Sequence, residues 1–316
     1  MKQSILFVNL ALLLPNVFVS GLKIASSLTT IEYTPEVIAI EDYYTGTASV
    51  VSGGAGSLFS DSTVDLASNA ETQALRQFSV HNDLRIIYTI AQVHYRLVAN
   101  KMKGINTLAD LQGRTIGAIP ATSSAYFVYK YLQTIGLDEN DYTVIFGNEC
   151  FAEPCAADTL PGMLAAGTVD AVGIWEPTLE LAIRAIGNKA KVFDGQNAYR
   201  EIFSLHTTTA KLADPVKRQE IVDFLQALNQ AEQMFQNDPE SVWPRVSNLL
   251  GVSESVLESV WPIHNFTSNI PDDLEDILIG EEQWIAAVDG RAPVPAAQLQ
   301  NIVDRSLLDE VFPPVP

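Results

Sequence analysis

The stretch TIGAIPATSSAYFVYKYLQTIG, residues 115–136, contains one complete strand-to-helix unit. Its first four residues predict a short strand, and Thr122 or Ser123 then caps a helix that ends at Gly136. Three ring or aliphatic side chains recur at every fourth position of this helix: Phe127, Tyr131 and Ile135. This spacing predicts one buried helix face.

The rest of the chain repeats this alternation nearly to its end. Further strands are expected at residues 22–26, 48–51, 64–67, 84–90, 95–99, 143–146, 171–175 and 191–193. Helices are expected at residues 34–44, 71–78, 160–166, 177–186 and 215–237, and two or three more in the last third. Alternating strands and helices predict an α/β fold with mostly parallel sheets flanked by helices. No low-complexity linker separates independent domains, which favours two lobes joined by short crossings.

The N-terminal residues 1–21 have the three parts of a signal peptide. Met1-Lys2 is a charged start, residues 5–14 are apolar, and Val19-Ser20-Gly21 ends the segment in mostly small residues. The apolar run is too short to span a membrane. A buried first helix is the alternative interpretation, but the strand expected at 22–26 follows immediately. We therefore expect a secreted or periplasmic protein.

The chain has 316 residues, of which 47% are hydrophobic and 18% charged, with a formal net charge of −19. Its length and apolar content suit two packed lobes. An acidic chain repels nucleic acid and anionic lipid surfaces, so neither is an expected partner. No later stretch is apolar enough to predict membrane insertion, and we expect a monomer.

The two cysteines, Cys150 and Cys155, enclose four residues. In an exported chain such a pair predicts a disulfide, which would stabilise the fold by roughly 2 kcal/mol. Metal binding by this pair is the alternative, but no histidine lies nearby in sequence. Asn265-Phe266-Thr267 is a glycosylation acceptor if the host is eukaryotic.

Known catalytic motifs are missing from the sequence. It has no G-x-S-x-G, no Walker loop and no H-E-x-x-H, and its four histidines are scattered. The run Gly53-Gly54-Ala55-Gly56 lacks dinucleotide-binding spacing and predicts a tight strand-to-helix connection instead. The sequence therefore favours a binding protein over an enzyme, with no cofactor and no metal.

In open parallel sheets, ligands bind at the carboxyl ends of the strands. The polar candidates selected by this rule are Thr29, Thr30, Asn69, Glu71, Gln92, Thr122, Ser123, Ser124, Trp175 and Glu176. Other residues at strand ends are Gly53, Gly54, His94, Asn148 and Glu149.

Two groups of these candidates have alternative interpretations. Thr122-Ser123-Ser124 could bind an anion at a helix start, or one of the three could simply cap the helix. Trp175 could form an apolar wall of the site. Glu176 could accept from an amine, or could sit in the first turn of the next helix, where a carboxylate is favoured.

Four segments together resemble one family: VDLASNAE at 64–71, GINTLADLQGRTIG at 104–117, LAAGTVDA at 164–171 and WEP at 175–177. They are similar to type II periplasmic substrate-binding proteins of ABC importers. The branch concerned binds nitrate, taurine, aliphatic sulfonates or thiamine-pyrimidine precursors. The resemblance implies two Rossmann-like lobes that close on a ligand, with crossings near 98–100 and 204–207. Lobe 1 would hold residues 22–99 and 207–316, and lobe 2 residues 100–206. His206, in the second crossing, completes the candidate site.

The resemblance implies capture of a small polar solute for ABC-type uptake. The solute could be a sulfonate, a taurine-like zwitterion, nitrate or a pyrimidine precursor. Two alternatives remain open. One is an enzyme resembling the synthase of the thiamine pyrimidine, although residues 150–155 do not match its cysteine-rich motif. The other is a secreted protein that kept the fold without a transporter partner.

Overall fold

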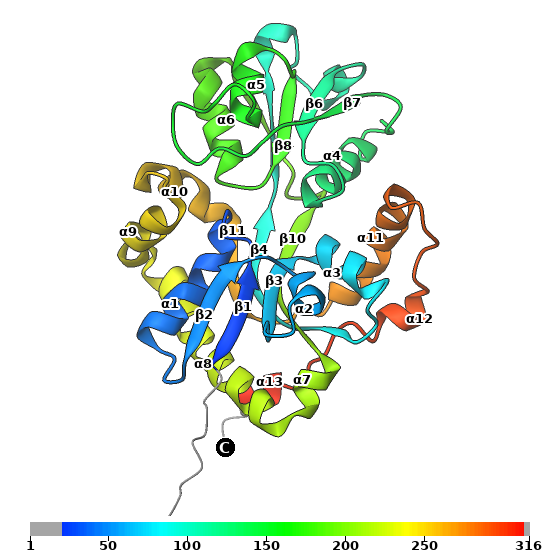
Figure 1. The fold of residues 1–316 in the computed structure, drawn as a ribbon. Helices are drawn as coiled ribbons and strands as arrows, with labels where there is room; N and C mark the ends of the chain where they lie inside the picture. Colours follow the sequence, from blue (N-terminus) through cyan, green and yellow to red (C-terminus); the bar gives the residue numbers. More distant parts are fainter. Residues whose placement is uncertain (1–20, 313–316) are drawn as a thin grey trace, which may run out of the picture.

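The computed structural model describes residues 21–312, which form two α/β lobes (Figure 1). The expected signal peptide lies outside these residues, apart from Gly21. Each lobe has its own β-sheet with helices packed on it, so the expected α/β class is confirmed. No helix within residues 21–312 is long and apolar enough to cross a membrane.

Lobe 1 is built on a six-stranded sheet with the order β11-β4-β10-β3-β1-β2. Its strands are β1 (Leu22–Ser26), β2 (Ala48–Ser52), β3 (Leu66–Ala70), β4 (Leu84–His94), β10 (Arg200–Thr208) and β11 (His264–Asn269). Strands β1, β2 and β3 are parallel, whereas β10 runs antiparallel to both β3 and β4. Strand β11 pairs antiparallel with the outer side of β4. The sheet is therefore mixed and not mostly parallel as expected, because two later segments of the chain return to it in the opposite direction.

Lobe 2 is built on a five-stranded sheet with the order β7-β6-β8-β5-β9. Its strands are β5 (Arg96–Asn100), β6 (Thr115–Ala118), β7 (Thr143–Phe146), β8 (Ala171–Ile174) and β9 (Ala190–Asp194). Strands β6, β7 and β8 are parallel, and β5 is antiparallel to β8 and β9. Its helices are α4 (Ser123–Gln133), α5 (Leu160–Ala166) and α6 (Thr178–Ile186).

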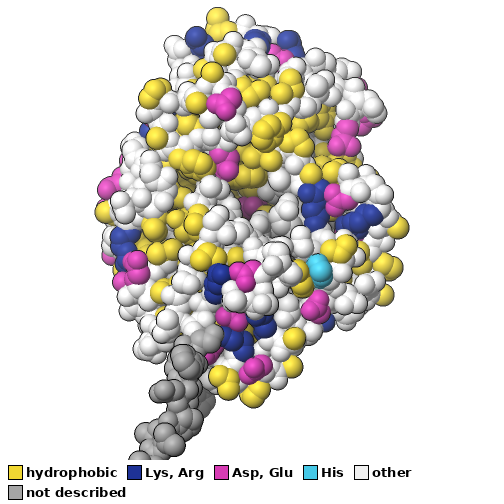
Figure 2. All heavy atoms as spheres, in the orientation of Figure 1, with side chains coloured by type: hydrophobic (Ala, Val, Ile, Leu, Met, Phe, Trp, Pro, Cys, Tyr) yellow, Lys and Arg dark blue, Asp and Glu magenta, His cyan; other side chains and the backbone are white. Residues whose placement is uncertain are grey.

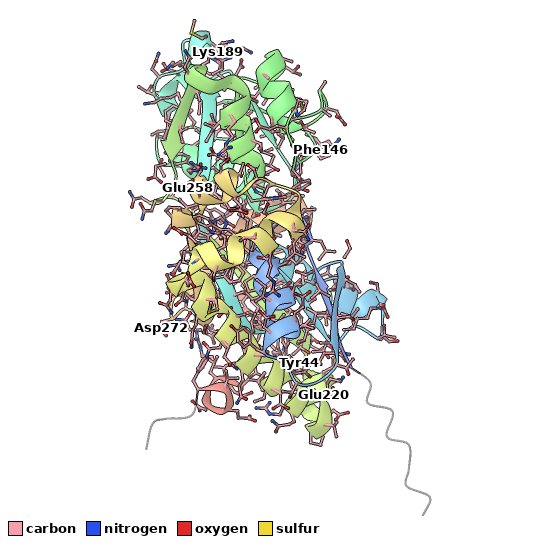
Figure 3. All side chains as sticks on the ribbon, turned by 90° about the vertical axis from the view of Figure 1, so that its left-hand side faces the viewer. Tyr44, Phe146, Lys189, Glu220, Glu258 and Asp272 are labelled. Atoms are coloured by element: carbon pink, nitrogen blue, oxygen red, sulfur yellow. A yellow bond between two sulfur atoms is a disulfide. The ribbon has the colours of Figure 1, made fainter. Side chains whose placement is uncertain are left out.

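Both faces of the lobe 1 sheet are covered by helices. On one side α1 (Thr34–Asp42) packs against α8 (Pro215–Asn237), and on the other α3 (Glu71–Phe78) packs against α11 (Leu274–Val288) (Figure 1). The remaining helices of lobe 1 are α2 (Ser57–Ser60), α7 (Thr209–Ala213), α9 (Pro239–Leu250), α10 (Glu254–Val260), α12 (Ala296–Leu299) and α13 (Leu308–Val311). Figure 3 shows Tyr44 and Glu220 toward the far end of lobe 1, and Phe146 and Lys189 on lobe 2.

The long helix α8 begins as its sequence predicts. Asp214 accepts from the backbone N–H groups of Val216 and Lys217, and Pro215 occupies the first turn, where its missing N–H costs nothing. The stripe expected to face the core is fully buried: Ile221, Leu225, Leu228 and Phe235. In α4, by contrast, the expected face is only partly correct. Phe127 and Tyr131 are buried, but Ile135 is 42% exposed because the helix ends at Gln133.

The chain passes between the two sheets twice, and both passages come earlier than expected. The first lies at Tyr95, between β4 and β5, and the second spans 195–199, between β9 and β10. The expected second crossing at 204–207 instead lies inside β10, which belongs to the sheet of lobe 1. The two crossings touch, because Gly195 N–H donates to the Tyr95 carbonyl at 3.1 Å. Aromatic rings of Tyr95 and Tyr199 pack edge-to-face there, with centroids 5.1 Å apart.

Candidate functional site

A cavity of about 200 Å3 lies between the lobes. Lobe 1 contributes Ser27, Thr30, Asn69, Ala70, Thr72, Gln73, Glu201 and Phe203, and lobe 2 contributes Thr122, Ser123 and Trp175. Most of these residues follow the carboxyl ends of parallel strands, where the chain turns away from the sheet. On the face shown in Figure 2, hydrophobic side chains gather along the boundary between the two lobes.

Five residues expected at the site line this cavity: Thr30, Asn69, Thr122, Ser123 and Trp175. They come from the ends of four different strands, two in each lobe. The other expected residues lie elsewhere.

The three hydroxyl residues at the start of α4 have separate roles. Thr122 Oγ1 accepts from Ser124 N–H at 3.2 Å, so Thr122 is the helix cap. Ser123 Oγ lies 3.0 Å from the hydroxyl of Tyr95 in the first crossing. Ser124 is buried and donates to the Gly173 carbonyl at 2.6 Å, which ties the helix start to β8. Thr122 and Ser123 are therefore the members of this trio that line the cavity.

Trp175 is held in place by the cysteine loop. Its indole N–H donates to Glu149 Oε1 at 2.7 Å, and Glu149 directly precedes Cys150. The predicted disulfide between Cys150 and Cys155 is present. The Cys150 backbone is bonded through both its N–H and its carbonyl to the hydroxyl of Thr178, at the start of α6. The loop thus fixes the carboxylate that orients the Trp175 wall.

Glu176 does not line the cavity. Its Oε1 lies 2.6 Å from a guanidinium nitrogen of Arg96, and its Oε2 accepts from Glu180 N–H at 2.9 Å. Arg96 also contacts Glu180 at 3.3 Å. Burial raises the pKa of Glu176, and the adjacent Arg96 opposes this shift. Glu176 thus fits neither interpretation as stated: it lies two residues before α6, caps the first turn of this helix through Glu180 N–H, and pairs with Arg96.

Glu71 likewise belongs to the frame around the site. It is fully buried and accepts hydrogen bonds from the Tyr199 hydroxyl and from Ile202 N–H, the latter at 2.7 Å. Burial raises its pKa, although these two bonds lower it. Glu71 thus anchors the second crossing and the first residues of β10 to the start of α3.

Three further expected residues lie off the cavity. Gln92 in β4 donates to Thr267 Oγ1 of the neighbouring β11 at 3.3 Å. His206 is buried within the sheet, between Ala67 of β3 and Ile86 of β4. Burial lowers the pKa of His206 to about 3, so its ring is neutral. Thr29 Oγ1 lies 3.2 Å from Ser27 Oγ, next to the cavity wall.

The sequence analysis missed one charged residue of the cavity, Glu201. This side chain is only 4% exposed, and its Oε2 has no hydrogen-bond partner among residues 21–312. Burial and the nearby carboxyls of Glu32 and Glu71 raise its pKa well above the usual range. Thr72, the second residue of α3, is also buried and lines the cavity. Its hydroxyl likewise has no partner in the part of the chain that the structure describes.

The lobes touch around the cavity. The carbonyl of Ala121, which precedes α4, accepts from Gln73 Nε2 at 3.3 Å and from the Arg76 guanidinium, both on α3. Ala121 has φ of +63°, a conformation that is uncommon for alanine and that aims this carbonyl at lobe 1. Elsewhere, Arg184 of α6 donates to the Ser255 carbonyl of α10 at 2.6 Å. The cavity thus lies between two lobes in direct contact.

A family comparison identifies the class of protein. Residues 52–242 match the family model described as NMT1/THI5 like, which is more than half of the chain. The chain belongs to the NMT1/THI5-like family. The comparison with curated proteins gives no match.

Solved structures show the same fold as this NMT1/THI5-like protein. The alkanesulfonate-binding protein SsuA from Xanthomonas axonopodis pv. citri, bound to MOPS, has a TM-score of 0.70 and 18% identity, covering 91% of this chain and 99% of that one. The ligand-binding component of an ABC-type import system from Staphylococcus aureus, with zinc bound, has a TM-score of 0.70 and 13% identity, with coverages of 92% and 98%. The fold that the resemblance to type II periplasmic binding proteins implies is therefore confirmed.

The same fold also occurs in an enzyme. The desulfurization enzyme DszB has a TM-score of 0.62 and 17% identity, covering 92% of this NMT1/THI5-like chain and 98% of its own. The fold is thus compatible with both binding and catalysis, and the function has to be argued from the cavity.

Two further features of the sequence concern metal binding and glycosylation. Within residues 21–312, no group of three or more His, Cys, Asp or Glu side chains could hold a metal ion. Asn265, the predicted glycosylation acceptor, is exposed on β11. Its modification stays a prediction.

Proposed function

We propose that this protein is an exported solute-binding protein that captures a small polar molecule between its lobes. The observation that carries this proposal is the cavity between the lobes, which is lined by hydroxyl, amide and indole groups from both of them. A ligand that contacts both lobes favours the closed arrangement over an open one, since only the closed arrangement offers all the contacts. Binding and lobe closure would then be coupled.

The two unpartnered polar groups support this proposal. Buried hydroxyl and carboxyl oxygens normally have hydrogen-bond partners, because leaving one unpaired costs free energy. Thr72 Oγ1 and Glu201 Oε2 both belong to residues that line the cavity. A polar ligand would supply the missing partners.

The biological role that we propose is delivery of the solute to an ABC-type membrane importer. This role is supported by the family and by the solved relatives, some of which are components of such import systems. A protein of this kind would act outside the cytoplasmic membrane, in accordance with the signal-peptide pattern of residues 1–21.

The test is a thermal-shift screen of the purified protein with sulfonates, taurine, nitrate, amines and pyrimidines. A ligand at 100 times its Kd stabilises the folded state by about 2.7 kcal/mol, which raises Tm by several degrees. The proposal fails if no compound raises Tm at millimolar concentration.

A matched pair of variants locates the binding site. Thr72→Val keeps the shape of the side chain and removes only the hydroxyl that lines the cavity. It should weaken a ligand that bonds there by about 3- to 10-fold. Thr63→Val, on the exposed surface of lobe 1, should leave the affinity unchanged. Equal affinities for the two variants would place the ligand away from Thr72.

A further inference from the structure

We infer that the cavity selects an organic cation, whose protonated nitrogen pairs with the carboxylate of Glu201. This inference rests on the proposed binding function and specifies the charge of its ligand. It runs against the sulfonates bound by several proteins of the same fold.

The first argument is the position of Glu201. It lies at the start of β10, between the second crossing and Phe203, and both Glu201 and Phe203 line the cavity. Its Oε2 has no partner among the residues that the structure describes. A buried carboxylate is stable only when it is paired or hydrogen-bonded. An N–H donor of a bound molecule is the partner that this oxygen needs.

The second argument is the charge around the cavity. None of the described residues that line it is Lys, Arg or His. Arg96, the nearby basic residue of lobe 2, is already paired with Glu176 and Glu180. Glu32 is fully buried close to Glu201, and its Oε1 lies 3.7 Å from His264 Nε2. The cavity therefore offers a carboxyl group to its ligand, with no basic side chain in its described lining.

The start of α4 does not reverse this preference for a cation. A helix N-terminus favours an anion by only about 0.3–1 kcal/mol at ordinary sites. Here one of its free N–H groups, that of Ser124, is already bonded to Thr122 Oγ1 at 3.2 Å. A sulfonate would face the carboxyl group of Glu201, and its favourable contacts would be hydroxyls, the amides of Asn69 and Gln73, and this helix start. A cation would gain an ion pair with the Glu201 carboxylate and would lose only the weak attraction that the helix start offers to an anion.

The third argument is the aromatic wall. Trp175 lines the same cavity as Glu201, and its indole is held by Glu149. A tryptophan face attracts cations and packs against flat rings. An amidinium or guanidinium group also matches a carboxylate with two parallel hydrogen bonds. The geometry therefore favours a flat molecule with a charged nitrogen at one end.

The charge state of Glu201 provides a specific readout. Burial and the carboxyls of Glu32 and Glu71 raise the pKa of Glu201 well above the usual range. The titratable groups that interact with it are Glu32, Glu71, Tyr95, Tyr199 and Glu281. A cation binds when Glu201 releases its proton to solvent, and the ligand charge then takes the place of the proton. Affinity should therefore rise with pH, by up to about tenfold per unit.

The experiment uses three flat molecules of nearly equal shape: benzamidine, which is cationic, benzamide, which is neutral, and benzoate, which is anionic. Taurine and methanesulfonate are added as sulfonate probes. Calorimetry of the purified protein at several pH values should show benzamidine binding with proton release and an affinity that rises with pH. Benzamide should bind at least about tenfold more weakly, and the anions should not bind.

Variants then test the role of Glu201. Glu201→Gln should weaken benzamidine by about 10- to 100-fold and remove the pH dependence. Glu36→Gln is the matched control, because Glu36 is also buried and also has unpartnered oxygens within residues 21–312, but does not line the cavity. It should leave benzamidine binding unchanged. If Glu201→Gln does not fold, the inference is still tested on the unmodified protein. Its affinities for benzamidine, benzamide and benzoate, and their dependence on pH, then show whether the cavity prefers a cation.

The outcomes separate the two proposals. Binding of a sulfonate or of benzoate in preference to benzamidine overturns the cation inference and leaves the solute-binding function in place. Equal binding of benzamide and benzamidine also overturns it. If neither the three flat molecules nor the sulfonates nor the compounds of the thermal-shift screen bind, the result counts against both the cation inference and the solute-binding function.

Discussion

At the scale of single residues, Glu71 shows that a polar residue at a strand end can hold the surrounding structure in place instead of contacting a ligand. It follows β3 directly, the position that predicts a ligand contact. The structure instead gives both of its oxygens partners within the protein, namely the Tyr199 hydroxyl and Ile202 N–H. These bonds fix the second crossing to α3.

Removing this carboxylate should destabilise the fold. Glu71→Ala leaves the Ile202 N–H and the Tyr199 hydroxyl buried without their acceptor, and each unpaired group costs about 1–3 kcal/mol. We expect the free energy of unfolding to fall by about 2–4 kcal/mol in urea denaturation. Tyr199→Phe removes one of the two bonds and should cost about 1 kcal/mol. If both variants lose the same stability, the Ile202 bond contributes nothing.

The cavity residues show what sequence reasoning can and cannot find. The strand-end rule identified Thr30, Asn69 and Trp175, because each follows or lies within the last residues of a strand whose carboxyl end is at the cavity. Glu201 escaped this rule because it begins a strand. Strand β10 is antiparallel to β3, so its first residues lie beside the last residues of β3, with Phe203 opposite Ala70. Glu201 can be placed at the cavity only if residues 200–208 are recognised as a strand that returns antiparallel to β3.

At the scale of elements, the two crossings explain why the lobe boundaries were hard to predict. Residues 200–208 follow β9 without an intervening helix, so the alternation of strands and helices breaks there. That segment, REIFSLHTT, was expected to contain the passage between lobes. Its burial in the middle of the lobe 1 sheet depends on pairing with β3 and β4, which are distant in sequence. Local sequence pattern does not encode such pairing.

The second crossing has a strict steric requirement at Gly195. A Cβ at this position would lie 2.5 Å from the Tyr95 carbonyl oxygen and 2.4 Å from the Phe127 ring. Gly195→Ala should therefore push the two crossings apart and lower the free energy of unfolding by about 1–3 kcal/mol. Chemical denaturation measures this loss, and ligand affinity should fall as well, because closure depends on the crossings.

The control for Gly195→Ala is a glycine with open surroundings. Gly280 lies inside α11, and a Cβ there would meet no atom within 4 Å. Gly280→Ala should raise stability by about 0.5–1 kcal/mol, since alanine favours the helix. A Gly195→Ala variant as stable as this control would show that the crossings can separate without cost.

At the scale of the whole molecule, the unusual feature is the number of carboxyl groups inside a protein with a formal net charge of −19. Burial raises the pKa of Glu32 to about 7 and that of Glu36 to about 8, from an ordinary value of 4.5. Burial also raises the pKa of Glu232 and Glu281. The folded protein therefore keeps protons that the unfolded chain releases near pH 4.5.

The buried histidines change the free energy of unfolding in the opposite direction, and they do so at lower pH. Burial lowers the pKa of His206 to about 3 and that of His264 to about 4, from 6.5. Below pH 6.5 the unfolded chain binds protons that these buried rings do not, so their contribution to stability is lost as pH falls from 6.5 toward the folded values. The carboxyls make their contribution below pH 4.5 and lose it as pH rises from 4.5 through their raised values.

The two trends together predict maximal stability in mildly acidic solution. Between pH 6.5 and 8 the histidines are neutral in both states, and only the buried carboxyls change. Glu36 alone should then lower the free energy of unfolding by about 1.4 kcal/mol per pH unit, or about 2 kcal/mol over this range. Urea denaturation at pH 5, 6.5 and 8 measures the curve. Glu36→Gln cannot lose a proton, so its stability should fall by about 2 kcal/mol less between pH 6.5 and 8. Parallel curves for the two proteins would show that Glu36 is ionised in the folded state throughout this range.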